Sequence, residues 1–392
     1  MTTSAAAQKR IADSATWLSE RAQGMEDVLA ELVEQNSFTE NVDGGRLVGN
    51  RLAALFAIPG LEVDRVQSTR FADHLVVRSV RAQGNTRPVA LVGHLDTVFP
   101  PGTFEGYRRD GDLSRGPGVL DMKGGLVTVA YALLALAETG GFDALPPLRV
   151  VIVADEEVGS PEGKGVLARE IHDASACLVF ESGRPKDEIV TRRKGTGAVV
   201  ARAHGKAAHA GLAHRDGANA IRALARFIEG AEALTDYAHG VTVNVGTVKG
   251  GISKNTVPDY AEAHVDIRFE TRAAADALIA KLHEVAAANP VQGTRIELEG
   301  GVARLPLERS DSSGLLLGEY GVAAQRFGLG FGEAPLSSGG SDANTAGALG
   351  IATIDGLGPR GRGFHTKDEY IERPTLLLRA QALVAFLLAR GV

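Results

Sequence analysis

The stretch from Val89 to Val98, VALVGHLDTV, constrains the fold of this chain more than any other. It begins as a short strand rich in Val and Leu and stops at Gly93, after which come His94, one spacer residue and Asp96. A strand that ends in His-x-Asp can place an imidazole on a metal ion through one nitrogen while the carboxylate binds the other nitrogen. The pattern therefore predicts a strand that delivers a metal ligand into a loop.

Other acidic residues also follow apolar runs. The run 148–154 is nearly continuous, as expected for a strand covered on both faces of a parallel sheet, and Glu156 and Glu157 come soon after it. A second run, 176–180, ends at Glu181. Helical patterns separate these runs, and the alternation predicts an α/β fold with a mostly parallel sheet flanked by helices. Because the carboxyl ends of parallel strands share one crevice, we expect these side chains to meet there.

A different pattern begins near residue 191. Strand, helix, strand, strand, helix and strand follow one another over about 110 residues, which matches a ferredoxin-like α+β insert. We expect residues 191–305 to form this inserted domain and residues 1–190 and 306–392 to form one α/β catalytic domain. The expected elements that matter below are helices at 11–35, 46–56, 315–327 and 374–388, strands at 62–66, 74–79, 260–269 and 295–298, and a Gly-rich loop at 102–121.

Charge and composition exclude several classes of protein. The formal net charge of −6 argues against an electrostatic nucleic-acid binder. Cys177 is the only cysteine, so neither an intrachain disulfide nor a cysteine-based zinc site can form. The N-terminus has no apolar signal region, and no window reaches about eighteen uncharged apolar residues. We therefore expect a cytoplasmic protein that binds neither membranes nor nucleic acids.

The chemical mix of the candidate ligands is informative. Each acidic residue alone is more often a solvated loop residue or a helix cap, and His365 alone is more often a surface histidine. Together they exceed chance, because a buried acid cluster without a cation would be strongly unfavourable. Two histidines and three carboxylates without cysteine suit zinc, manganese or cobalt with open positions for water. Since the adjacent Glu156 and Glu157 cannot easily point the same way, one can bind metal while the other faces a bound water, as a metal-assisted hydrolase requires.

Several motifs resemble those of a known family. In chain order they are GHLDTV, GPGVLDMKGG, DEEVGS, VFESG, GKAAHAG and GFHTKDEY. Their order and spacing are similar to those of the dizinc metallopeptidase and amidohydrolase family that contains glutamate carboxypeptidase, acetylornithine deacetylase, succinyl-diaminopimelate desuccinylase and aminoacylase. The resemblance spans nearly the whole chain. The stretches RRKGTG and GGISKNTVPD, together with Glu181, look most like the glutamate carboxypeptidase branch.

This resemblance implies a metal centre with two zinc ions per subunit, for which cobalt or manganese are alternatives. Asp96 would orient a metal-bound histidine, and Glu156 would act as the general base for a metal-bridging hydroxide and later protonate the leaving amine. The family also implies a non-proline cis peptide bond after Asp121. The implied metal ligands are His94 and Glu181 for one ion, Glu157 and His365 for the other, and Asp121 between them.

The resemblance assigns further roles to the insert. It would be the dimerisation domain of a homodimer, and His209 would reach into the partner subunit's site and stabilise an oxyanion. The alternative for His209 is an ordinary turn histidine beside glycines. Arg268, Arg304, Asn255 and Gly340 match substrate-binding positions of the family. A planar guanidinium suits a carboxylate, although an arginine on an antiparallel strand more often forms a surface ion pair.

Three functions remain open at this point. The first is a dizinc exopeptidase that releases a C-terminal amino acid, with a glutamate-like one as a candidate, from a peptide or conjugate with a free carboxylate. The second is an N-acyl-amino-acid deacylase with the same metal centre. The third is a catalytically silent dimer that uses the fold for binding, which is disfavoured because all five ligand candidates and the base are present.

Overall fold

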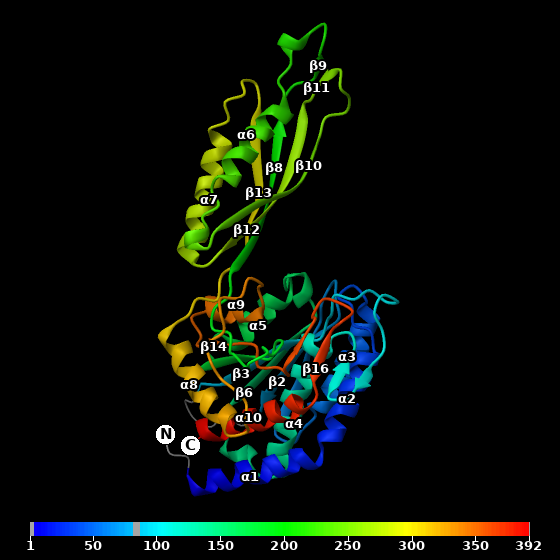
Figure 1. Ribbon diagram of the computed structural model, residues 1–392, viewed down its shortest axis with the longest axis vertical. Helices are drawn as coiled ribbons and strands as arrows, with labels where there is room; N and C mark the ends of the chain where they lie inside the picture. Colours follow the sequence, from blue (N-terminus) through cyan, green and yellow to red (C-terminus); the bar gives the residue numbers. More distant parts are fainter. Residues whose placement is uncertain (1–3, 81–86, 392) are drawn as a thin grey trace. The chain divides into compact units, whose positions relative to one another are not determined.

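The computed structural model describes residues 4–80 and 87–391, and the chain forms two compact units (Figure 1). The first, called the α/β unit below, comprises Met1–Arg192, Arg309–Leu336 and Ser341–Val392. The second, called the insert unit, comprises Arg193–Glu308 and Ser337–Gly340.

A six-stranded sheet forms the centre of the α/β unit, in the order β1-β2-β6-β3-β7-β14. Strand β2 is antiparallel to both of its neighbours, whereas β6, β3, β7 and β14 run parallel. This mostly parallel sheet confirms the predicted fold class. The strands are β1 (Leu61–Val66), β2 (His74–Ser79), β3 (Val89–His94), β6 (Leu148–Val153), β7 (Ala176–Val179) and β14 (Thr353–Ile354).

Helices cover both faces of this sheet. Val89 and Leu91 of β3 belong to a core shared with α1 to α4, α8 and α10. The alternate residues Ala90 and Val92 are equally buried and point to the opposite face, where α5 and α9 pack on β6 and β7. The helices are α1 (Ala5–Glu20), α2 (Ala22–Glu34), α3 (Val42–Leu55), α4 (Gly124–Glu138), α5 (Gly163–Ile171), α8 (Asp311–Gln325), α9 (Asp342–Ala348) and α10 (Pro374–Arg390).

The single helix predicted over 11–35 is wrong, because the structure has two helices there. Arg21 lies between α1 and α2 with φ −115° and ψ 14°, outside the helical range. Leu18 before the break and Met25 after it are both fully buried in the same core. The apolar pattern therefore continues across the break and does not reveal it.

The predicted loop over 102–121 is also wrong in part. It contains a hairpin of β4 (Arg108–Asp110) and β5 (Leu113–Arg115), and β4 is exposed along its length, which explains the missing apolar pattern. In a second sheet, β5 pairs with β16 (Tyr370–Glu372), which pairs with β15 (Gly361–Arg362). This pairing joins two regions of the chain that are about 250 residues apart in sequence.

Helix α4 is the most apolar of the described helices in the α/β unit. A side chain at Gly125 would place its Cβ 2.1 Å from the carbonyl oxygen of Phe180, so only glycine allows α4 to pack this closely against the end of β7. Among the described residues, the stretch Val119–Glu138 is long and apolar enough to cross a membrane by length and composition. However, 89% of its most apolar window is buried inside the structure, and a core helix passes the same test.

The insert unit contains a four-stranded antiparallel sheet in the order β10-β12-β8-β13. Helices α6 and α7 pack on one face of it, and a short pairing of β9 with β11 is added to the predicted element order. The strand predicted at 295–298 runs on to Arg304, because Gly300 and Gly301 adopt positive φ and continue the pairing. The elements are β8 (Gly195–His204), β9 (Ala208–His209), α6 (Ala220–Glu232), β10 (Thr242–Gly250), β11 (Thr256–Val257), β12 (Tyr260–Phe269), α7 (Arg272–Ala287) and β13 (Arg295–Arg304).

Candidate metal centre

Three of the predicted ligands come from the carboxyl ends of three adjacent strands, β6, β3 and β7. His94 is the last residue of β3, Glu157 lies in the turn after β6, and Glu181 follows the end of β7. Neighbouring parallel strands end at the same edge of a sheet. The sheet topology alone therefore brings these three side chains close together.

The other two ligands lie outside the central sheet. Asp121 belongs to the turn η1 (Val119–Lys123), and its peptide bond to Met122 is cis, which confirms the expectation drawn from the resemblance. His365 lies between β15 and β16 and has a positive φ of 62°. The pairing of β16 with β5 holds this loop beside η1.

The two carboxylate oxygens of Asp121 face the two histidines. His94 Nε2 lies 3.3 Å from Asp121 Oδ1 and 3.7 Å from Glu181 Oε1. His365 Nε2 lies 3.3 Å from Asp121 Oδ2 and 3.1 Å from Glu157 Oε2. Each histidine thus faces one oxygen of Asp121 and one further carboxylate. The two histidines and their carboxylates are therefore grouped around Asp121 as potential metal donors.

Asp96 holds the second nitrogen of His94. Nδ1 of His94 lies 3.0 Å from the carbonyl oxygen of Asp96 and 3.4 Å from its Oδ1. The same carboxylate accepts the N–H groups of Glu156 at 3.1 Å and Glu157 at 3.2 Å, and the hydroxyl of Thr39 at 2.8 Å. Asp96 therefore orients His94 with Nε2 toward the ligands and also fixes the turn that carries two acidic residues.

Glu156 lies at the edge of this cluster. One of its side-chain oxygens is within 4.8 Å of ligand atoms of His94 and Glu181, which in turn lie within 4.8 Å of each other. The same criterion joins His94, Asp121 and Glu157. Glu156 is thus next to the ligands without needing to be one of them.

The cluster changes the pKa of its members. Burial raises the pKa of Glu181 to about 8, and the charge of Asp121 adds to this effect. Burial acts in the same direction on Asp121, but hydrogen bonds from His365 and His94 outweigh it and hold the pKa of Asp121 well below its usual range. Hydrogen bonds to Asp121 and Glu157 raise the pKa of His365 to about 10. Protonated imidazoles here supply the positive charge that a bound cation would otherwise supply.

These donors fit a metal of the zinc type. Two imidazole nitrogens and several carboxylate oxygens, with no thiolate among them, suit zinc, cobalt or manganese. The residues that would hold the ions are His94, Asp121, Glu157, Glu181 and His365.

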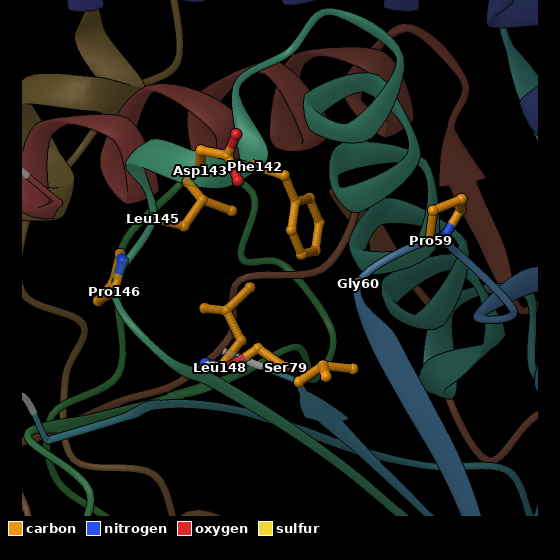
Figure 2. A pocket seen from close by; sticks show the side chains of 9 residues that line it. Pro59, Gly60, Ser79, Phe142, Asp143, Leu145, Pro146 and Leu148 are labelled. Atoms are coloured by element: carbon orange, nitrogen blue, oxygen red, sulfur yellow. Dashed lines mark hydrogen bonds between the residues drawn. The ribbon is translucent and has the colours of Figure 1, made fainter. Parts of the chain in front are cut away.

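A pocket of about 360 Å³ lies elsewhere in the α/β unit (Figure 2). Phe142, Leu145 and Leu148 supply apolar surface to it, and Ser79 also lines it. Leu148 is the first residue of β6, whereas the acidic ligands follow the last residue of that strand. The pocket is therefore at the opposite end of the sheet from the metal ligands.

The insert unit holds the remaining predicted site residues. His209 is the exposed last residue of β9, and its Nδ1 accepts the N–H groups of Gly211 and Leu212, each at 3.1 Å. Asn255 immediately precedes β11, which pairs with β9. His209 thus accepts hydrogen bonds within its own turn, and Nε2 is the nitrogen that remains for another partner.

Arg268 and Arg304 lie on the two strands that flank β8, and both are opposite Thr196. They therefore share one face of the insert sheet. Arg268 donates two hydrogen bonds to Asp266, at 2.8 and 2.9 Å. It therefore forms an ion pair of the kind that is common for an arginine on an antiparallel strand. Arg304 is buried, with 8% of its surface exposed. Gly340 also belongs to this unit.

Sequence reasoning missed two residues that hold the centre. Thr39 donates its hydroxyl to Asp96, and Glu369 accepts the N–H of Asp121 at 3.0 Å. No pattern in the sequence marks Thr39. Glu369 belongs to the GFHTKDEY motif, but Asp368 beside it has the same chemistry, and only the structure distinguishes the two.

Known proteins resemble both units. The family model described as "Peptidase dimerisation domain" (M20_dimer) matches residues 191–294. Carboxypeptidase G2 of Pseudomonas sp. (strain RS-16) is 28% identical over 350 residues, which cover 88% of this chain and 84% of that protein. Succinyl-diaminopimelate desuccinylase of Methylobacterium nodulans is 30% identical over 278 residues, which cover 64% and 69%. The crystal structure of aminopeptidase PepT from Bacillus cereus superposes with a TM-score of 0.79 at 25% identity, over 94% of this chain and 98% of that one.

The chain belongs to the M20 peptidase family. The family resemblance predicted from the motifs is therefore confirmed. As an M20 protein, it is a hydrolase of a peptidase and amidohydrolase family that depends on metal ions, and its relatives include carboxypeptidases. The cluster of histidines and carboxylates at the end of the central sheet agrees with this dependence.

We predict that zinc affinity rises as the pH is raised from 7 toward 8. In the metal-free protein, the pKa of about 8 for Glu181 and of about 10 for His365 lies above pH 7, so both groups hold protons that a cation must displace. Raising the pH lowers the protonated fraction of both. Calorimetric titration with Zn²⁺ in buffers of different ionisation enthalpy counts the protons released. Binding without proton release, and with no change of affinity with pH, would contradict the prediction.

Proposed function

We propose that this chain is a dizinc exopeptidase that releases a C-terminal amino acid, with a glutamate-like residue as the first candidate, from a peptide or an N-acyl conjugate. The observation that carries the proposal is the position of Asp121. Each of its two oxygens lies 3.3 Å from a different histidine, and each histidine has its own further carboxylate. A centre of this form has room for two cations, with Glu156 at its edge.

The donors support zinc, two ions per subunit, with cobalt or manganese as alternatives. When bound, such ions supply Lewis acidity that polarises the scissile carbonyl and makes a water molecule more acidic. The remaining work belongs to the side chains of the protein.

Glu156 is placed to move the proton. Its carboxylate lies close to His94 and Glu181. Its backbone N–H donates a hydrogen bond to the Asp96 carboxylate, with a distance of 3.1 Å. A carboxylate there can take a proton from the attacking water as the water oxygen bonds to the carbonyl carbon. The same proton then passes to the amide nitrogen as the C–N bond breaks, so that the amine leaves neutral.

The insert unit supports recognition of a carboxylate. Arg268 and Arg304 lie on one sheet face, one strand to either side of Thr196. Guanidinium groups bind carboxylates through parallel hydrogen bonds, and Arg304 is held in place by burial. In this proposal the pair binds the carboxylate of the amino acid that is released, and Asp266 competes with the substrate for Arg268.

A homodimer is part of the proposal. The family model that matches the insert is named for dimerisation. His209 is exposed and its Nδ1 is occupied by two backbone N–H groups, which leaves Nε2 to stabilise an oxyanion in the partner subunit's site. Asn255, beside His209, and Gly340 are further candidates for substrate contacts.

The second candidate is an N-acyl-amino-acid deacylase with the same metal centre. The 30% identity to a succinyl-diaminopimelate desuccinylase favours it, because that relative is named for removing an acyl group. The two functions differ in which half of the substrate the protein recognises, and the metal centre serves both equally well.

We predict that hydrolysis follows the amino-acid half of the substrate. With zinc-loaded protein, one series keeps an N-benzoyl group and varies the amino acid, and a second keeps glutamate and varies the acyl group. Amidation of the free carboxylate should lower kcat/KM about 10- to 100-fold, the value of a charged hydrogen-bonded contact. Rates that follow the acyl group and ignore the carboxylate would support the deacylase instead, and no hydrolysis of any amide would refute both.

We predict that Glu156→Gln lowers kcat about 10²- to 10⁴-fold, the usual contribution of a general base, while metal content stays unchanged. Glu157→Gln is the matched control. It makes the same change in the neighbouring residue. Because Glu157 is a proposed metal ligand, with Oε2 3.1 Å from His365 Nε2, this variant should bind metal more weakly and so should lower metal content as well. Normal turnover by Glu156→Gln with a full complement of metal would remove Glu156 from the mechanism.

We predict that two inactive variants restore activity when mixed. His209→Ala should lose rate but keep metal, because His209 lies in the insert unit and is not a ligand. In a mixed dimer with Glu156→Gln, one site has both intact residues if His209 acts across subunits, so equal mixing should recover about one quarter of wild-type activity. If subunit exchange is verified by mass and no activity returns, each site is built within one chain.

A further inference from the structure

A fully buried carboxylate, that of Glu369, holds the backbone on which Asp121 sits. Its Oε1 accepts the N–H of Leu120 at 2.8 Å and that of Asp121 at 3.0 Å, and its Oε2 accepts the N–H of Gly118 at 3.1 Å. The side chain is 0% exposed. Three backbone donors from one turn therefore converge on one carboxylate, in a nest of the kind that binds anions.

The turn needs this acceptor because its backbone is not helical. Asp121 and Met122 have φ and ψ of −119° and 91° and of −133° and 35°, although α4 begins only two residues later. Gly118 adopts a positive φ of 75°. A backbone of this shape cannot satisfy its N–H groups within the helix, and buried donors without acceptors are costly. Glu369 supplies the acceptors.

The same short segment also supplies a metal ligand. His365 precedes Glu369 by four residues, and Thr366 ties the segment together, because its N–H and its hydroxyl both donate to the carbonyl of Gly363, at 3.0 and 2.7 Å. One end of the segment thus faces the side chain of Asp121, with His365 Nε2 at 3.3 Å. The other end holds the backbone of Asp121 through Glu369.

We propose that Glu369 is a positioning residue for the metal centre: it fixes Asp121 relative to His365, so that both can bind the same cation. This inference rests on the metal centre of the proposed function. It adds a residue that contacts neither metal nor substrate and acts through the backbone of a ligand.

The alternative is that Glu369 only stabilises the fold. The two roles differ in what a substitution changes. Loss of a fold anchor lowers thermal stability and leaves the ligands of the folded protein in place. Loss of a positioning residue leaves every ligand present but lets Asp121 move away from His365, so that metal affinity falls and the geometry at the metal changes.

Glu369→Gln tests this with little change of volume. The amide keeps one acceptor oxygen but presents an NH₂ group where a second oxygen faced backbone N–H groups, so at least one of the three contacts becomes repulsive. In the full-length, metal-stripped protein, the Zn²⁺ dissociation constant should rise about 10- to 100-fold, the usual effect of losing a group that orients a ligand. The visible spectrum of bound Co²⁺ should change in shape as well.

Glu170→Gln is the matched control. Like Glu369, Glu170 is buried. It accepts two hydrogen bonds from the Arg78 guanidinium, at 3.1 and 2.7 Å, and it contacts no metal ligand. This variant should lower the thermal unfolding midpoint but leave the Zn²⁺ dissociation constant and the Co²⁺ spectrum as in the wild type. If Glu369→Gln is not recovered folded, Glu369→Asp keeps the carboxyl group, shortens the side chain, and should give a smaller loss in the same direction.

Two results would overturn the proposal: Zn²⁺ affinity and a Co²⁺ spectrum in the Glu369 variants equal to those of the wild type, or the same loss of affinity in Glu170→Gln. The wild type separates this failure from that of the proposed function. If the wild-type protein itself binds neither Zn²⁺ nor Co²⁺, the metal centre is wrong, whereas equal binding by wild type and variants removes only the role of Glu369.

Discussion

Asp121 is a largely buried carboxylate that lies between two imidazoles, and the rest of the centre depends on this contact. Glu157 and Glu181 lie in the same cluster, and carboxylates so close together in the interior repel one another strongly. Burial, with the charge of Asp121 added to it, raises the pKa of Glu181 to about 8, whereas hydrogen bonds from His365 and His94 hold the pKa of Asp121 below its usual range. Positive charge is required to keep such a cluster ionised, whether it comes from histidines or from metal ions.

The positions of the ligands depend on two further residues, which accept hydrogen bonds from the backbone of the turns that carry those ligands. Asp96 accepts two N–H groups from the turn that carries Glu156 and Glu157. Glu369 accepts three from the turn that carries Asp121. The strands supply rigid ends, but turns are less constrained, and buried carboxylates can pin them because each oxygen accepts more than one hydrogen bond. This division explains how five segments of the chain reach one site.

The insert unit differs from the α/β unit in how its sheet is covered. Its helices cover only one face of its sheet, so the strands alternate between buried and partly exposed residues, as β8 and β12 show. The uncovered face can therefore carry polar side chains in rows across strands, and Arg268 and Arg304 form part of one such row with Thr196. In the proposed function, this row binds the carboxylate of the substrate.

The local pattern of the sequence was enough to predict strands such as β2 and β12, the α/β class, and the residue types of a metal site, because side-chain periodicity and the acids after apolar runs are properties of short segments. It was not enough for the break at Arg21, the hairpin before η1, or the roles of Thr39 and Glu369. Which oxygen of Asp121 faces which histidine was decided only by the tertiary structure. That choice depends on the pairing of β5 with β16 across about 250 residues, a contact between distant segments that no local pattern encodes.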